Sequence, residues 1–234
     1  MRAAPDHDRL ITPDEGAATA PSRRERSKDG RRARILGAAV DILREAGIDD
    51  LTMRVVAERA GVSPTTVYNL FGSKRAVLAA VFDADLARFE AIVAQAPSRD
   101  ALARLLDSVD VAMGLYHADP AFYRAILWRR PNAASDLALG TAMHEPRTRF
   151  YRRMIDAIAA EGLLRPCTDT GLLGALASHM MFGLIADWID DLTPLERLGT
   201  DMKRGLAVVL LGFATAPAAA RLHAVLAGTP AAGD

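Results

Sequence analysis

The exposed face of one short predicted helix carries side chains that can contact DNA. The hydroxyl, phenol and amide groups on this face belong to Thr65, Thr66, Tyr68 and Asn69. Such groups can hydrogen-bond to phosphates and to base edges in the major groove. The pair Ser63-Pro64 precedes them and is typical of the first turn of a helix. We therefore predict a recognition helix from Ser63 to Phe71.

A second helix, beginning at Thr52, must hold the recognition helix in place. Thr52 and Ser63 each carry a hydroxyl that can accept from the free N–H groups of a first turn. Ala57, Gly61 and Val67 follow at steps of four and six residues. A small residue, a left-handed turn and an apolar anchor at this spacing predict a helix-turn-helix. A helical hairpin inside an ordinary all-helical domain has the same pattern, and remains the alternative.

The segment Phe71-Gly72-Ser73-Lys74 closes the recognition helix and begins a third helix at Ser73. Lys74 then lies in a first turn, where the helix dipole disfavours a positive charge. A phosphate partner explains the lysine better than helix stability does.

The motif resembles the DNA-binding signature of the tetracycline-repressor (TetR) family of bacterial regulators. The residues that carry the resemblance are Ala60-Gly61-Val62-Ser63, Thr66-Val67-Tyr68, Phe71, Ser73-Lys74 and Leu78. It covers roughly Arg32 to Leu78, and beyond that only length and helical pattern agree. The resemblance implies that Thr52, Tyr68 and Lys74 contact phosphates and that Thr65, Thr66 and Asn69 lie at the bases. Many members carry histidine or tyrosine where this chain has Asn69.

A basic segment precedes the motif. From Ser22 to Arg34, seven lysines and arginines face two acidic residues, although the whole chain has a formal charge of +0. Such a run can be a solubilising tail, but beside a helix-turn-helix it can follow the DNA backbone. The full set of predicted DNA-binding residues is Thr52, Ser63, Thr65, Thr66, Tyr68, Asn69, Lys74, Arg31 and Arg32.

Composition predicts a soluble, cytoplasmic, globular protein. Of 234 residues, 50% are hydrophobic and 25% charged, and Cys167 is the one cysteine. This excludes an internal disulfide framework and fits a reducing compartment. We expect a disordered tail (1–21), a basic arm (22–30), the helix-turn-helix domain (31–75), an effector-binding and dimerisation domain (76–227) and a flexible tail (228–234).

Apolar spacing predicts an all-α fold throughout. The first helix should run from Arg31 to Ala46 and end at Gly47, and a long helix from Ser73 to Gln95 should connect the DNA unit to the body. Pro146 should kink or restart its helix. The later predicted helices are Arg99–His117, Pro120–Arg129, about Ser135–Glu161, Thr170–Leu192, Leu195–Ala214 and Ala218–Ala227.

Aromatic, sulfur and imidazole side chains on three consecutive segments could line an effector pocket. The candidates are Tyr116, His117, Phe122, Tyr123, Trp128, Met143, His144, Tyr151 and Met154. For any single one of them, core packing is the better explanation. The family resemblance implies a small-molecule effector, and we expect an apolar or aromatic one, because Arg124, Arg129 and Arg130 look like surface groups.

Two late segments, Leu172 to Ile189 and Leu206 to Ala214, are apolar around their whole circumference. A helix of this kind must be covered on all sides. One side fits the chain's own core and the other a second copy, and the resemblance implies a four-helix bundle. The candidate dimer residues are Ala175, His179, Phe182, Ala186, Ile189, Leu206, Val209 and Phe213. A membrane hairpin is the alternative, and His179, Asp187 and Pro217 argue against it.

Catalytic and metal-binding patterns are not found in the sequence. The five histidines and one cysteine lack metal-ligand spacing, and there is no glycine-rich phosphate loop. We predict no enzyme activity, no metal and no cofactor. The expected function is a homodimeric, ligand-responsive repressor that binds a palindromic DNA operator. The alternatives are a ligand-free DNA-binding protein controlled by a protein partner, and a helical small-molecule-binding or catalytic protein with a vestigial helix-turn-helix.

Overall fold

The computed structural model describes residues 23–127 and 134–228, with the backbone alone at 23–25 and 134–144. These residues form ten helices and, between Leu164 and Ala214, one isolated antiparallel bridge. The helices are α1 (Arg23–Asp50), α2 (Met53–Arg59), α3 (Pro64–Phe71), α4 (Lys74–Gln95), α5 (Ala101–Ala118), α6 (Pro120–Leu127), α7 (Ala134–Ala160), α8 (Thr170–Ile189), α9 (Leu195–Leu211) and α10 (Ala216–Ala227). The all-α prediction is confirmed.

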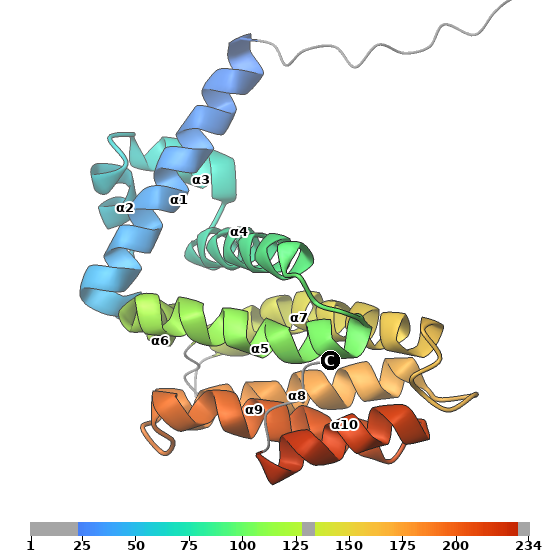
Figure 1. Cartoon of the computed structure of the whole chain (residues 1–234). Coiled ribbons are helices and arrows are strands. Elements are labelled where there is room, and N and C mark those ends of the chain that lie inside the picture. Colours follow the sequence, from blue (N-terminus) through green and yellow to red (C-terminus); the bar gives the residue numbers. More distant parts are fainter. Residues whose placement is uncertain (1–22, 128–133, 229–234) are drawn as a thin grey trace, which may run out of the picture.

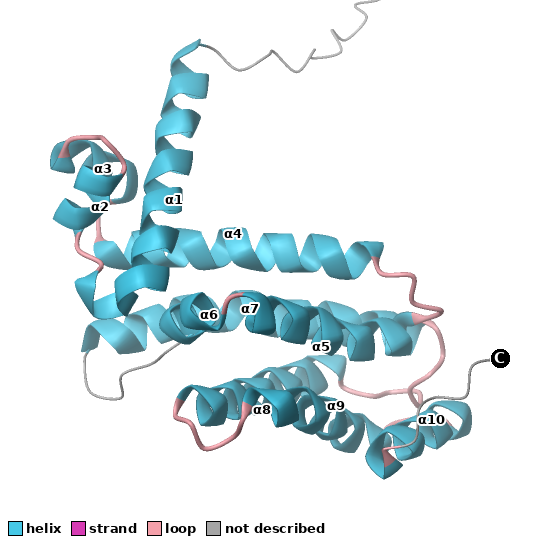
Figure 2. Cartoon of the chain, turned by 60° about the vertical axis from the view of Figure 1, so that its left-hand side comes forward, coloured by secondary structure: helices cyan, strands magenta, loops and turns pink. Residues whose placement is uncertain are grey.

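Two units are visible in the arrangement of the helices (Figure 1). Helices α2 and α3 pack beside the middle of α1, whose N-terminal turns project beyond them. Helix α4 leaves this unit and lies along the body, above α5, α6 and α7, while α8, α9 and α10 form the layer on the far side (Figure 2). Helix α4 therefore belongs to both units, and α6 packs against α1 where the two units meet.

Helices α2, α3 and α4 each begin at a capping side chain. The hydroxyls of Thr52, Ser63 and Ser73 accept hydrogen bonds from backbone N–H groups in the first turns of α2, α3 and α4. Gly61, with φ +62°, makes the turn between α2 and α3, and Gly72, with φ +77°, ends α3. These left-handed conformations are strained for residues with a side chain. The local signals in the sequence thus fix the helix boundaries of the motif.

Helix boundaries differ from the predictions at several places. Helix α1 begins at Arg23, so that residues expected in a basic arm continue the first helix, although Gly47 (φ 80°) interrupts it where the sequence predicts its end. Pro146 lies inside α7 without ending it. Helix α8 ends at Ile189 and α9 at Leu211, each three residues before the end predicted from the sequence. The predicted tail at 1–21 lies outside the described residues, as do residues 229–234 of the predicted tail at 228–234.

Helix α8 is, within residues 23–127 and 134–228, the one helix long and apolar enough to cross a bilayer by length and composition. It packs against α7 and α9 in the body. Leu173, Ala177, Met181, Ile185 and Trp188 form its buried face. The spacing of these residues is that of a helix with one side in a protein core.

Candidate DNA-binding surface and effector pocket

Helix α3 buries one residue and exposes the side chains that the sequence predicts to contact DNA. Val67 is 0% exposed and anchors the helix, whereas the ring of Tyr68 is 53% exposed. Thr65 and Asn69 are also exposed, and Thr66 is partly so. A solvated tyrosine beside a free amide and a free hydroxyl offers hydrogen-bond donors and acceptors to a major groove.

Two of the predicted DNA-binding residues hold the helix starts. The Thr52 hydroxyl accepts from the N–H of Val55 at 3.2 Å. The Ser63 hydroxyl accepts from the N–H of Thr66 at 3.2 Å and also lies 2.9 Å from the Thr66 hydroxyl. Both side chains remain exposed. Their first role is therefore to cap α2 and α3, with the outer side of each hydroxyl still open to a phosphate.

The predicted basic residues also have structural partners. Lys74 donates from Nζ to the Ile48 carbonyl at 2.6 Å, which ties the start of α4 to the end of α1. Arg32 donates to the Leu70 carbonyl at 3.0 Å and lies over the Phe71 ring, 4.4 Å from its centroid. Arg31 donates to the Ser27 hydroxyl at 2.7 Å. The sequence suggested a phosphate partner for Lys74, because the helix dipole disfavours a positive charge in a first turn. The Ile48 carbonyl is a second explanation for the lysine at this position.

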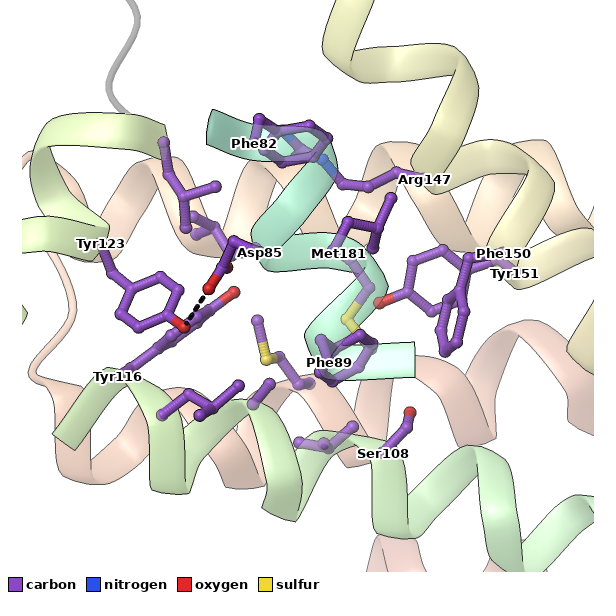
Figure 3. A pocket seen from close by; sticks show the side chains of 17 residues that line it. Phe82, Asp85, Phe89, Ser108, Tyr116, Tyr123, Arg147, Phe150, Tyr151 and Met181 are labelled. Atoms are coloured by element: carbon purple, nitrogen blue, oxygen red, sulfur yellow. Dashed lines mark hydrogen bonds between the residues drawn. The ribbon is translucent and has the colours of Figure 1, made fainter. Parts of the chain in front are cut away.

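A cavity of about 80 Å³ lies in the body between α4, α5, α6, α7, α8 and α9 (Figure 3). Its walls are mostly aromatic and aliphatic. The lining residues are Phe82, Asp85, Leu86, Phe89, Ser108, Val109, Ala112, Leu115, Tyr116, Tyr123, Leu127, Arg147, Phe150, Tyr151, Met181, Ile185 and Met202. A space of this size admits several water molecules or a small organic group.

One wall of the cavity carries a partly buried carboxylate. Asp85 on α4 accepts from the Tyr123 hydroxyl at 3.0 Å and from Arg88 at 3.2 Å. Arg88 also donates to the Tyr123 oxygen at 3.0 Å. Burial raises the pKa of Asp85 above its ordinary value, in spite of these donors. Burial likewise raises the pKa of Tyr123, so its phenol stays protonated.

The cavity contains three of the nine residues predicted from the sequence, Tyr116, Tyr123 and Tyr151. Phe122 and Met154 pack in the core instead, and the His117 side chain is exposed. Trp128 and the side chains of Met143 and His144 lie outside the described residues. The prediction missed the walls from α4, α8 and α9, and also Arg147, because no local pattern shows which helices pack together.

Helix α6 connects the cavity to the DNA-binding unit. Its Tyr123 holds Asp85 of α4, and Asp119, the residue before α6, pairs with Arg44 of α1 at 2.6 Å. Burial alone would raise the pKa of Asp119, but hydrogen bonds from Arg44 and the Phe122 N–H outweigh it and leave the pKa lowered. On its other side, Arg124 donates to the Ile189 carbonyl at the end of α8, at 3.0 Å.

Comparison with known proteins identifies the N-terminal unit. The family model described as "Bacterial regulatory proteins, tetR family" matches residues 35–81, which run from α1 through the helix-turn-helix into α4. The N-terminal unit is a TetR-family DNA-binding domain. The family prediction made from the motif is thereby confirmed.

Relatives of known name match smaller or larger shares of the chain. The tetracycline repressor class A from transposon 1721 of Escherichia coli is 47% identical over 53 residues, which is 23% of this chain and 24% of that protein. The match thus spans about a quarter of the repressor's length. A fatty acid metabolism regulator protein of Bacillus subtilis is 27% identical over 160 residues, covering 66% of this chain and 79% of that one.

The body shares its fold with solved TetR-family structures. FadR of Thermus thermophilus, a TetR-family transcriptional repressor solved in complex with lauroyl-CoA, aligns with a TM-score of 0.64 and 22% identity. The alignment covers 79% of this chain and 95% of that one. At this identity the likeness shows the fold, and the ligand is a property of that protein.

The outer faces of α8 and α9 carry apolar side chains without cover in the single chain. On α8, Leu172 is 52% and Leu176 47% exposed, and the exposed His179 follows on the same side. On α9, Val208 is 63% exposed, and Phe213 just beyond the helix is 37% exposed. We call these five residues the outer stripe. An apolar surface of this kind marks an interaction site.

The dimer residues predicted from the sequence agree with the outer stripe only in part. His179 and Phe213 belong to it, and Ala175, Phe182, Ala186, Ile189 and Val209 are partly buried. Leu206, which the sequence also suggested, is 0% exposed and packs in the chain's own core. Val208, which the prediction omitted, lies two positions further along α9 and therefore points to the outer side of the helix.

Proposed function

We propose that this chain is a ligand-responsive transcriptional repressor of the TetR family. It acts in the cytoplasm as a homodimer on a palindromic DNA operator, and it has no catalytic step of its own. The observation that carries the proposal is the joint presence of an exposed polar face on α3 and a cavity in the body, with α4 in contact with both. A solvated helical face alone fits many domains, but a cavity attached to it fits a regulated one.

The DNA contacts follow from the exposure of α3. Tyr68, Thr65 and Asn69 face solvent from one short helix, and the Thr52 and Ser63 hydroxyls stand at neighbouring helix starts. Two such helices, related by a dimer axis, can enter successive major grooves on one side of a duplex. The projecting N-terminal turns of α1 carry the exposed Arg26, Lys28 and Arg34 and can add phosphate contacts.

Ligand binding can reach the DNA unit through two elements. Helix α4 lines the cavity with Phe82, Asp85, Leu86 and Phe89, and its first residue, Lys74, is tied to α1. Helix α6 joins the cavity residue Tyr123 to the Asp119–Arg44 pair on α1. A ligand that fits one arrangement of these helices better than another shifts the dimer between two spacings of α3.

The outer stripe supports the homodimer. Two copies placed with α8 and α9 face to face cover Leu172, Leu176 and Val208, which a single chain leaves in water. A two-fold axis through this surface makes the same patch serve both subunits. The dimer then presents two copies of α3, as a palindromic operator requires.

The deciding experiment is binding of the purified protein to its own upstream intergenic DNA at two salt concentrations. We expect saturable binding that weakens as salt rises, since phosphate contacts release counterions. Tyr68→Ala should weaken binding by about tenfold or more. Tyr68→Phe is the matched control for the ring without its hydroxyl.

Equal, weak binding of wild type and Tyr68→Ala to every DNA, together with a random-sequence selection that returns no motif, would contradict the proposal. Sequence-specific binding that no compound in a hydrophobic panel releases, and no thermal stabilisation by that panel, would point to control by a protein partner.

A further inference from the structure

The cavity contains two tyrosine hydroxyls with no hydrogen-bond partner among the described residues. Tyr116 is 9% exposed, and its ring stacks on Trp188 at 5.4 Å, so its position is fixed. Tyr151 approaches from α7, where its ring meets Phe150 edge-on at 5.2 Å. Figure 3 shows both hydroxyls directed toward the interior of the cavity. Two donors that face a cavity in this way can each bind an acceptor inside it.

Both hydroxyls are donors at neutral pH. Burial raises the pKa of Tyr116 to about 12, and burial also raises the pKa of Tyr151. Both residues line the same cavity. Protonated phenols can each donate one hydrogen bond, so each offers a donor to an acceptor group of a ligand in the cavity.

A guanidinium lies beside this pair. Arg147 lines the cavity and stacks over the rings of Phe82 and Phe182, with 5.2 Å and 5.1 Å to their centroids. Its positive charge lowers the pKa of both Tyr116 and Tyr151, opposing the effect of burial. The carboxylate of Asp85 has Arg88 and Tyr123 as its own partners. Arg147 is the cation among the lining residues, and Asp85, whose charge raises the pKa of Tyr116, is the anion.

The remaining lining is apolar. Leu86 and Phe89 on α4, Val109 on α5, and Met181 and Ile185 on α8 surround the space between the polar groups. A ligand for this cavity therefore needs a hydrophobic body as well as an acceptor group.

We propose that the effector is a small hydrophobic acid, whose carboxylate accepts hydrogen bonds from Tyr116 and Tyr151 beside Arg147 while its body fills the apolar part of the cavity. This assignment rests on the proposed ligand-responsive function and specifies its ligand class. It departs from the expectation of an uncharged effector, which considered only arginines outside the cavity.

Calorimetric titration of the full chain, free of DNA, tests the ligand class with three probes that share one body. The probes are octanoate, octanol and octylamine. We expect octanoate to bind about tenfold more tightly than octylamine, because hydrogen bonds to a charged acceptor are the strong ones. Octanol should fall between them. Equal affinities, tighter binding of the amine or the alcohol, or no binding of octanoate would overturn the assignment.

Isosteric variants test the named residues. Tyr116→Phe and Tyr151→Phe each remove one donor without opening a void, so each should weaken octanoate by about tenfold and leave octylamine within about twofold. Tyr68→Phe, on the exposed face of α3, is the control and should change neither affinity. Unchanged octanoate binding in both cavity variants would contradict the carboxylate site.

A separate DNA-release assay distinguishes the ligand class from the regulatory function. Octanoate that binds in the calorimeter and depends on Tyr116 and Tyr151, yet leaves a specific DNA complex intact, would support the acid site and contradict ligand-controlled repression. Release of DNA by octylamine but not by octanoate would support regulation and contradict the acid site.

Discussion

The helix-turn-helix and the cavity use polar side chains in opposite ways. On α3, Tyr68 and Asn69 are exposed, and each can be replaced without disturbing a neighbour. In the cavity, Tyr116 and Tyr123 are buried among other rings, with centroids 4.7 Å apart, and their pKa values are raised. Substitutions on the DNA-binding surface can thus change DNA affinity without changing the stability of the fold. Substitutions in the cavity change both the pocket and the stability of the fold.

The largest expected effect compares one aromatic residue from each region. Trp188 is 1% exposed, stacks on Tyr116 and lies under Arg124. Trp188→Ala should lower the free energy of unfolding by about 3–5 kcal/mol, because it leaves a large void. Tyr68→Ala should change it by less than about 0.5 kcal/mol. Denaturant unfolding at one fixed protein concentration measures both, and similar losses would remove the contrast between the regions.

The next effect concerns DNA affinity. Asn69→Ala should weaken binding to the operator fragment by about 1–3 kcal/mol, since an asparagine that pairs with a base edge contributes that much discrimination. Its melting temperature should stay unchanged. Tyr151→Phe, a cavity variant outside the link from Tyr123 to Asp119, should leave the ligand-free DNA affinity within about twofold. Fluorescence anisotropy measures the DNA affinity of both variants. An Asn69→Ala protein that binds DNA as tightly as the wild type would mean that other residues contact the bases.

A smaller effect separates folding from binding at a single position. Ser63→Ala removes the cap of α3 and should cost about 1 kcal/mol of stability. Ser63→Asp keeps a capping oxygen, and so should keep the stability, but it turns a negative charge toward the phosphates and should abolish tight DNA binding. Thermal unfolding and anisotropy on the same samples test this, and strong DNA binding by Ser63→Asp would mean that Ser63 lies away from the DNA.

The smallest effect is a pH dependence in the body. A bidentate hydrogen bond from Arg221 on α10 lowers the pKa of Asp100, the cap of α5. Because its folded pKa lies below its unfolded value, the pair contributes stability above about pH 4 that is lost as the pH falls through the folded pKa. Asp100→Asn should remove about 1 kcal/mol of this acid-dependent stability. Parallel pH curves for the two proteins would contradict it.

The helix-turn-helix could be predicted because its signals are local. Ser63 caps α3 through a residue three positions on, and Gly61 and Gly72 take the left-handed conformations that their turns require. Such features depend on a few neighbouring residues, so the sequence shows them directly. The partners of Lys74 and Arg32 could not be predicted, because Ile48 and Leu70 come close only after three helices have packed.

The cavity and the outer stripe depend on packing that sequence patterns do not specify. Arg147 and Phe89 meet in one cavity only because α4 and α7 cross there. On α9, Leu206 and Val208 are both apolar, and a difference of two positions turns one inward and the other outward. When a helix is apolar on every side, its sequence does not show which side is buried in the chain's own core. Only the folded structure shows which of these faces points inward.

Helix α8 has the cavity on one side and the outer stripe on the other. Met181 and Ile185 line the cavity, while Leu172 and Leu176 face outward, across a single helix about 10 Å in diameter. A ligand that moves this helix also alters the surface on which two copies meet. By reciprocity, pairing of the subunits changes ligand affinity by the same factor. The apparent dissociation constant of the ligand should therefore vary with protein concentration, so that the abundance of the protein in the cell sets its sensitivity.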